Sequence, residues 1–273
     1  MIDSADFSIG ERKFRADLDS GVSLAINLDF DGDQPRVFGS PPAKAAPVVA
    51  GDYVGSVREG GPCNVEQITV SFHTSGTHTE CVGHISRSRI SITDVVENSL
   101  IPATLITVTP EAIGSDSYHV PIEKGELFIT RSSLEEALAE SDGNLIKGLV
   151  VRTLPNDESK LTRDYDRESF PFFSNEAMRH IREWGVRHLL VDIPSVDRAD
   201  DGGQLGNHRI FWNVAAGDSD IDPENCSRRT ITEMIFVPDS VKDGNYLLGL
   251  QLPAFLSDAA PSRPIVYPVH EVD

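Results

Sequence analysis

The sequence predicts an α/β fold with a large mixed sheet or a barrel-like β core and flanking helices. Short β-branched or aromatic runs recur along the 273 residues and outnumber the segments with helical spacing. The helical segment 174–184 leads almost directly into the apolar run 188–194, a step that is typical of mixed architectures. No linker rich in Gly and Pro divides the chain, so we expect one domain over residues 1–273.

Eight runs have the composition of strands, and Gly, Pro or Asp residues bound them. In chain order they are 66–72, 103–109, 126–130, 148–154, 188–194, 230–237, 245–252 and 263–269. Their number is the reason for expecting a large sheet or barrel.

Two segments have the pattern of helices. In the first, 132–140, Ser133 is followed three residues later by Glu136, which is the spacing of a capping box. The second begins after a suitable N-cap, Ser174, and ends at Gly185. Four of its apolar residues recur at helical spacing and are expected to face the core: Ala177, Met178, Ile181 and Trp184.

Three stretches rich in Asp and Gly lie between these elements, at 29–62, 155–169 and 196–229. We expect them to be long surface loops. Functional residues often lie on such loops.

The chain is strongly acidic, with 24 basic residues, 43 acidic residues and a formal charge of −19. Such a surface repels phosphate backbones and anionic lipid, so a small-molecule substrate is expected rather than nucleic acid or a membrane. No run approaches the ~20 apolar residues of a membrane helix, and the N-terminal segment lacks the apolar core of a secretory signal. Three scattered cysteines are too few for a disulfide framework, which makes the cytoplasm the simplest location.

The segment 71–86, "SFHTSGTHTECVGHIS", contains three of the eight histidines of the chain. If the backbone is extended after Gly76, His78 and Glu80 point to the same face, and His73 could fold back towards them across the turn. Two imidazoles and a carboxylate would then suit a Zn²⁺-like or Mn²⁺-like cation. His84 could be a fourth ligand or a proton carrier, since its ordinary pKa is near neutrality. The alternative is a polar loop whose side chains bond only to water or backbone.

Two further residues stand out later in the chain. Glu233 lies inside the apolar run 230–237, where a buried carboxylate is costly unless it is paired or bound to a metal; the alternative is an edge strand with this side chain in water. His208 ends a loop-like stretch before a short aromatic run, and a lone histidine there is more often structural than a ligand.

Other chemistries have less support. Cys81 could be a nucleophile with His84 as its base, although a small buried thiol is the commoner use of cysteine. No GxSxG, GxGxxG or GxxxxGK[ST] motif is present, so the markers of nucleophile-elbow hydrolases and nucleotide-binding proteins are missing. Tyr53, Phe72 and Trp212 could stack on an aryl substrate, although core positions are the simpler expectation for each.

"HTSGTHTECVGH" resembles the H-x-G-T-H-x-D-x-P-x-H signature of the metal-dependent cyclase or kynurenine formamidase-like hydrolases. The segments 150–155, 188–197, 207–212, 230–236 and the closing "LGLQLPAF…SRPIVYPV" resemble later blocks of that family in the same order, so the resemblance covers about residues 20 to 269. Three departures indicate a divergent subgroup. His73 precedes His78 by five residues instead of four, Glu80 replaces the usual Asp, and "CVG" replaces "xPx".

The resemblance implies a swivelling β/β/α fold and one or two divalent cations, Zn²⁺ or Mn²⁺. Carried over by position, His73, His78 and Glu80 would bind the first metal, and Glu80 would bridge to a second. The second metal would be held by His208 and Glu233, and His84 would be the catalytic histidine. The family also implies a homodimer or homotetramer.

We therefore expect a metal-dependent hydrolase that cleaves a small amide, formamide or lactam C–N bond with metal-activated water and His84 as general acid and base. One alternative is lactone hydrolysis or dehydration at the same metal site. The other, from a different class, is a protein that binds metal or ligand without catalysis.

Overall fold

The computed structural model describes residues 2–141 and 143–272, and most of its β structure belongs to one mixed sheet of 11 strands. Its strands are β1 (Ser4–Ile9), β2 (Arg12–Asp17), β3 (Val22–Ser23), β8 (His78–Cys81), β9 (Leu100–Val108), β11 (Gly148–Thr153), β13 (His188–Val191), β14 (Thr230–Glu233), β15 (Gly244–Gly249), β16 (Ala259–Pro261) and β17 (Ile265–Val272). Their order is β1-β2-β17-β15-β9-β11-β13-β14-β8-β16, with β3 paired to β17. The expected α/β class with a large mixed sheet is confirmed.

The central strands β9, β11, β13 and β14 run parallel, and antiparallel strands extend the sheet on both sides. Side chains alternate between two apolar cores, as the two-residue period of a strand requires. In β11, Leu149 and Val151 pack into the core shared with the helices, whereas Val150 packs into the second core. Because both faces are covered, Leu149, Val150 and Val151 form a continuous apolar run.

The second core is enclosed because the sheet curls into a barrel-like shape. β3 pairs with β17, and two residues later Ala25 forms a bridge with Ile235, just beyond β14. The segment 22–25 thus connects β17, on one side of the central strands, with the chain just beyond β14, on the other side. Leu24 lies inside this closure with no exposed surface.

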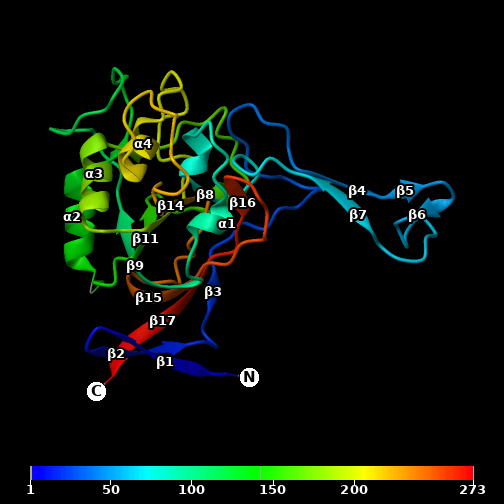
Figure 1. Cartoon of the computed structure of the whole chain (residues 1–273), viewed down its shortest axis with the longest axis horizontal. Coiled ribbons are helices and arrows are strands. Elements are labelled where there is room, and N and C mark those ends of the chain that lie inside the picture. Colours follow the sequence, from blue (N-terminus) through cyan, green and yellow to red (C-terminus); the bar gives the residue numbers. More distant parts are fainter. Residues whose placement is uncertain (1, 142, 273) are drawn as a thin grey trace.

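Helices cover the first core on the outer side of the sheet (Figure 1). They are α1 (Ile92–Val95), α2 (Arg131–Glu140), α3 (Asn175–Glu183) and α4 (Gly206–Trp212), with the 3₁₀ turn η1 (Val82–Ile85). The other 3₁₀ turn, η2 (Glu158–Leu161), packs Leu161 against a smaller, separate core. As expected, Ser174 caps α3 through Ala177 N–H, and Gly185 follows the helix with φ +81°. The predicted apolar face of α3 is buried, except that Trp184 is only partly so.

The predicted cap of the first helix was one turn late. Thr130 is the N-cap of α2, and its Oγ1 accepts from Ser133 N at 3.1 Å while Ser133 Oγ accepts from Thr130 N at 3.0 Å. The hydroxyl of Ser133 thus has the role that the sequence pattern suggested for the carboxylate of Glu136.

An arm of two antiparallel strand pairs projects from the rest of the molecule (Figure 1). It contains β4 (Lys44–Pro47) paired with β7 (Glu66–Thr69), and β5 (Val49–Ala50) paired with β6 (Tyr53–Val54). The run 66–72 was expected to be a strand leading into the histidine cluster, but only 66–69 is strand, and all four residues are exposed. The remaining short pair is β10 (Phe128–Ile129) with β12 (Phe172–Phe173).

All three expected loops contain short elements. The stretch 29–62 forms strands of the arm, 155–169 contains η2, and 196–229 contains α4. Within the part of the chain that the structure describes, no helix combines the length and apolar character of a membrane span. All three cysteines are free thiols.

Candidate metal centre

β8 carries two of the predicted ligands on one side of the strand. His78 and Glu80 are two residues apart in extended backbone, so their side chains point to the same face. The turn before β8 requires Gly76, whose φ of +82° lies in the left-handed region. Both side chains are buried, with 0% and 1% exposure. The expected orientation of these two residues is therefore confirmed.

The neighbouring strand β14 adds Glu233. The two strands pair antiparallel with Glu233 opposite His78, and Glu233 Oε2 is 3.5 Å from His78 Nε2. The carboxylate is buried, and its Oε1 accepts a hydrogen bond from Val196 N at 3.0 Å. A solvated glutamate on an edge strand is excluded, because β13 and β8 flank β14.

His208 reaches the same point from α4. Its Nε2 lies 2.9 Å from Glu80 Oε1 and 3.7 Å from Glu233 Oε1. The residue is buried and belongs to a helix rather than to the end of a loop. The fold thus brings this distant histidine to the carboxylates of β8 and β14.

His73 and His84 complete the cluster. His73 Nδ1 is 2.9 Å from Glu80 Oε2, so the extra residue before His78 does not keep His73 away. The 3₁₀ turn η1 brings His84 Nδ1 to 3.9 Å from the same oxygen, and the rings of His73 and His84 stack with centroids 4.1 Å apart. These two side chains keep 28% and 27% exposure. They are therefore open to a bound molecule.

The clustered acids and imidazoles shift one another's pKa. Burial opposes a charge on His73, but hydrogen bonds to Asp258 and Glu80 outweigh it and raise the pKa of His73 to about 10. Burial also opposes charge on Glu80, yet His84 and His208 hold the pKa of its carboxyl well below the usual value. Despite burial, Glu80 holds the pKa of His208 well above the usual value. His73 and His208 therefore favour their protonated forms, and a binding cation must displace these protons.

Two buried atoms fit a bound cation. Among the described residues, His78 Nε2 and Glu80 Oε1 have no hydrogen-bond partner, although His208 Nε2 lies 2.9 Å from that oxygen. Buried polar atoms without a partner are costly. Where several ligands point at one ion, their atoms lie close together without the alignment of a hydrogen bond. A mixture of imidazole and carboxylate ligands suits Zn²⁺ or Mn²⁺.

The donor atoms form overlapping sets. His73, His78 and Glu80 each offer one ligand atom within 4.8 Å of the others, and so do Glu80, His208 and Glu233. Because Glu80 is in both sets and has two oxygens, the cluster could hold one or two divalent cations.

Two acids that sequence reasoning missed hold site histidines. Asp197 Oδ2 is 2.8 Å from His208 Nδ1, and Asp197 also accepts from the backbone N–H groups of Asn207 and His208. Asp258 Oδ2 is 2.8 Å from His73 Nε2. The only sequence signals were their places just after the strand run 188–194 and just before the last strand run. Many acids in so acidic a chain have comparable positions.

Five of the predicted residues line one cavity of about 360 Å³: His73, Glu80, His84, His208 and Glu233. Phe38 lines the same cavity, with 47% exposure and a φ of +58°. Holding a non-glycine residue in the left-handed region costs about 1–3 kcal/mol, and such strain is concentrated at functional sites.

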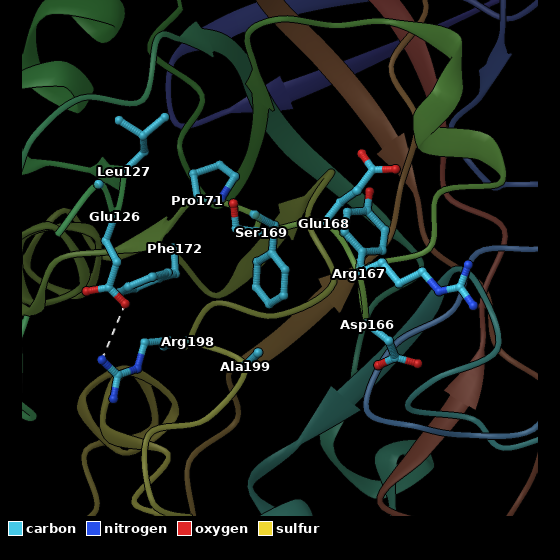
Figure 2. Close-up of a pocket in the computed structure, with 13 residues that line it drawn as sticks. Glu126, Leu127, Asp166, Arg167, Glu168, Ser169, Pro171, Phe172, Arg198 and Ala199 are labelled. Atoms are coloured by element: carbon cyan, nitrogen blue, oxygen red, sulfur yellow. Dashed lines mark hydrogen bonds and ion pairs between the residues drawn. The ribbon is translucent and has the colours of Figure 1, made fainter. Parts of the chain in front are cut away.

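A second cavity of about 310 Å³ shares Arg198 and Ala199 with the first (Figure 2). Leu127, Pro171 and Phe172 form an apolar part of its wall (Figure 2). Arg198 extends towards Glu126, and Arg198 Nη1 lies 3.3 Å from Glu126 Oε1 (Figure 2). The two cavities are therefore neighbours, separated by residues 198–199.

Cys81 has the structural role of a buried thiol. It has no exposed surface, its Sγ lies 3.7 Å from Ile90 O, and burial raises its pKa to about 12. Since a nucleophilic cysteine must be a thiolate, this environment disfavours the nucleophile hypothesis.

The aromatic residues suggested for substrate stacking do not face the cavity. Tyr53 is on the arm, and Phe72 stacks on Phe255 with centroids 5.5 Å apart. Trp212 is buried in the core against His208, with ring centroids 5.2 Å apart. None of the three is among the described residues that line the metal-centre cavity.

Comparison with known proteins gives a consistent result. Residues 22–198 match the profile of the family described as "Putative cyclase". A kynurenine formamidase of Bacillus thuringiensis (strain Al Hakam) is 28% identical over 218 residues, covering 78% of this chain and 85% of the relative. A solved structure described as a predicted metal-dependent hydrolase from Bacillus stearothermophilus is 18% identical, with a TM-score of 0.58 over 91% of this chain and 98% of that one. An isatin hydrolase bound to the product analogue thioisatinate is 12% identical, with a TM-score of 0.61 over 91% and 92%.

Proposed function

The chain belongs to the cyclase family, and from this premise we propose that it is a metal-dependent hydrolase of a small amide, formamide or lactam C–N bond. The observation that carries the proposal is the cluster of five donors with two unpartnered buried atoms. It lies beside a cavity that His84 also lines.

His73, His78 and Glu80 would hold one cation, and Glu80, His208 and Glu233 a second. A divalent cation supplies Lewis acidity, which polarises a carbonyl group and makes water a stronger nucleophile at neutral pH. Zn²⁺ and Mn²⁺ both accept this mixture of imidazole and carboxylate. Asp197 supports the site by accepting a hydrogen bond from His208 Nδ1, which leaves Nε2 free as the ligand atom.

His84 is the residue placed to move the proton. It is partly exposed and lines the cavity, whereas His78 and His208 are buried. His84 takes a proton from water as the water oxygen bonds to the carbonyl carbon. When the C–N bond breaks, His84 returns that proton to the leaving nitrogen, so one water is consumed and an acid and an amine are formed. Such proton transfer is typically worth ~10²–10⁴-fold in rate.

An aryl substrate is supported by Phe38, whose exposed ring lies at this cavity. Aromatic faces favour ring stacking. A kynurenine formamidase and an isatin hydrolase among the similar proteins suggest aryl formamides and cyclic aryl amides as the first compounds to assay.

The test combines metal analysis with assays on formanilide and isatin. We expect the purified chain to contain Zn²⁺ or Mn²⁺, and H84A to lose ~10²–10⁴-fold in turnover while retaining its metal, because this residue moves protons. H180A is the matched control, since His180 lies on α3 and pairs with Glu135 at 2.9 Å. Unchanged turnover in H84A would remove His84 from the chemistry.

A substrate panel separates the alternatives. Products of lactone opening or dehydration would favour another reaction at the same site. A metal-containing protein that is inert across the panel would favour a binding protein. A chain that contains no divalent cation and takes none up would refute the proposal.

We also propose a homodimer or homotetramer. The arm carries four exposed aliphatic residues, and large exposed apolar patches often mark interaction sites: Val49, Val57, Val65 and Ile68. Light scattering should give a mass of two or four chains, and a monomeric mass would refute this proposal. The cytoplasmic location stays a prediction from the sequence.

A further inference from the structure

Asp258 lies outside the signature of the cyclase family, yet its side chain contacts two histidines of that signature. Asp258 Oδ2 is 2.8 Å from His73 Nε2 and 3.5 Å from His84 Nδ1. The same two rings stack on each other with centroids 4.1 Å apart and planes inclined by 30°. One carboxylate oxygen thus faces one nitrogen of each imidazole.

The backbone fixes Asp258 in this position. The residue directly precedes β16, in which Ala259 is paired with Glu80, and Asp258 O accepts a hydrogen bond from Cys81 N at 3.0 Å. On the other side, Ser257 O accepts from Ile92 N at 2.7 Å. The carboxylate is therefore held at the edge of β8 by the pairing of the sheet.

Gly83 makes this close approach possible. A Cβ at Gly83 would lie 2.9 Å from Asp258 Cβ and 2.2 Å from Ile90 O, distances at which the backbone would have to move. The position of Asp258 thus depends on the absence of a side chain at residue 83.

The contacts determine which nitrogen of each ring carries its proton. A neutral imidazole has one donor and one acceptor nitrogen, and the group facing one nitrogen decides the tautomer. A carboxylate accepts hydrogen bonds only, so it favours N–H at His73 Nε2 and at His84 Nδ1. With a cation bound in place of the proton that Glu80 Oε2 otherwise accepts at 2.9 Å, His73 Nδ1 would be left as the ligand atom. In His84 the acceptor is Nε2, which can take a proton from water.

We propose that Asp258 is a positioning residue that holds His73 as an Nδ1 ligand and His84 as an Nε2 base. The proposal rests on the proposed function for the role of His84. It adds one acid that serves both the metal-binding and the proton-transferring histidine. Carboxylates that orient metal-bound histidines typically contribute 10–100-fold to metal affinity or activity.

The test uses the full-length Zn²⁺-loaded chain and the variants D258N, D258A and D258E. In ¹⁵N-histidine NMR spectra, we expect wild-type His84 to carry its proton on Nδ1. In D258N the amide can donate to Nδ1, so the proton should move to Nε2. If Asp258 had a purely structural role, D258N would leave both the NMR spectrum and the rate unchanged, because its amide has the shape of the carboxylate.

Two further measurements test the role of His73 in metal binding and the role of His84 in turnover separately. Chelator competition should show about 10–100-fold weaker Zn²⁺ binding in D258A through His73, with the stoichiometry retained. With saturating Zn²⁺, kcat should fall by about 10–100-fold in D258N and D258A with little change in KM, and D258E should recover part of the loss. D222N is the matched control, because Asp222 is exposed and bonds to Asn225.

The outcomes are distinct from those for the proposed function. If no amide is cleaved but D258N changes the His84 tautomer and D258A weakens Zn²⁺ binding, the positioning role stands and the hydrolase proposal fails. Wild-type tautomers and Zn²⁺ affinity in all three variants would overturn the positioning role. So would the loss of one Zn²⁺ equivalent in D258A, because Asp258 would then be a ligand itself.

Discussion

His188 is expected to make the stability of this protein depend on pH. It begins β13, is 7% exposed, and its Nδ1 is 2.9 Å from Thr230 Oγ1. Burial is the main reason that its pKa falls from 6.5 to about 4, and the neighbouring positive charge of Arg187 lowers it further. The folded protein therefore holds this imidazole neutral at a pH at which the unfolded chain protonates it.

Proton linkage gives the sign and the size of the contribution of His188 to the free energy of unfolding. Between pH 6.5 and about 4 the unfolded chain binds one more proton at His188 than the folded chain does, so the free energy of unfolding rises with pH in this window. The contribution is complete above pH 6.5 and is lost as the pH falls towards 4. At 1.36 kcal/mol for each pKa unit, the whole effect is about 3 kcal/mol, of which about 2 kcal/mol is lost by pH 5.

The assay compares the wild-type chain with H188Q by urea unfolding between pH 7.5 and 5, with a chelator present so that metal release does not contribute. Acidic groups affect both proteins alike, so the difference between their free energies of unfolding reports on His188. We expect the wild-type value to fall by about 2 kcal/mol relative to H188Q over this range. H270Q is the matched control, because His270 is exposed on β17.

Parallel pH curves for wild type and H188Q would refute the reasoning. They would mean that His188 is protonated equally in the folded and unfolded chains, which requires water or an acid to reach its ring.

Three further outcomes are expected. K160M should destabilise the fold by about 3–5 kcal/mol in urea unfolding, because Lys160 Nζ is 2.8 Å from Asp192 Oδ2 and its loss leaves a buried carboxylate without its counter-ion. D197N should weaken Zn²⁺ binding by about 10–100-fold in chelator competition, because the amide no longer holds His208 in the ligand tautomer. Zn²⁺ binding at pH 7 should release protons, measured with an indicator dye, and should strengthen as pH rises, because the pKa of His73 is raised to about 10.

Each of these predictions has a control or a contradicting result. R87M breaks an exposed pair with Asp220 and should cost no more than about 1 kcal/mol, so an equal loss in K160M would contradict the buried-pair argument. D222N should bind Zn²⁺ like wild type, and equal binding by D197N would show that Asp197 does not support the ligand. Zn²⁺ binding without proton release would mean that His73 is not protonated in the metal-free chain.

The sequence alone determined the local parts of this protein. Six of the eight expected strand runs lie in the large sheet, and Ser174 and Gly185 bound α3 as expected. The common direction of His78 and Glu80 followed from strand geometry. These features depend on residues a few positions apart, so the spacing of residue types contains the information.

The tertiary structure decided which distant groups meet. Glu233 lies opposite His78 only because β14 pairs with β8 in that register, and His208 reaches Glu80 only because α4 forms within a stretch that has a loop-like composition. Asp197 and Asp258 had no distinguishing pattern, and the strand composition of 66–72 did not indicate that its strand, 66–69, lies exposed on an arm. Pairing register and helix packing result from burial summed over the whole chain, so no local spacing of residues contains them.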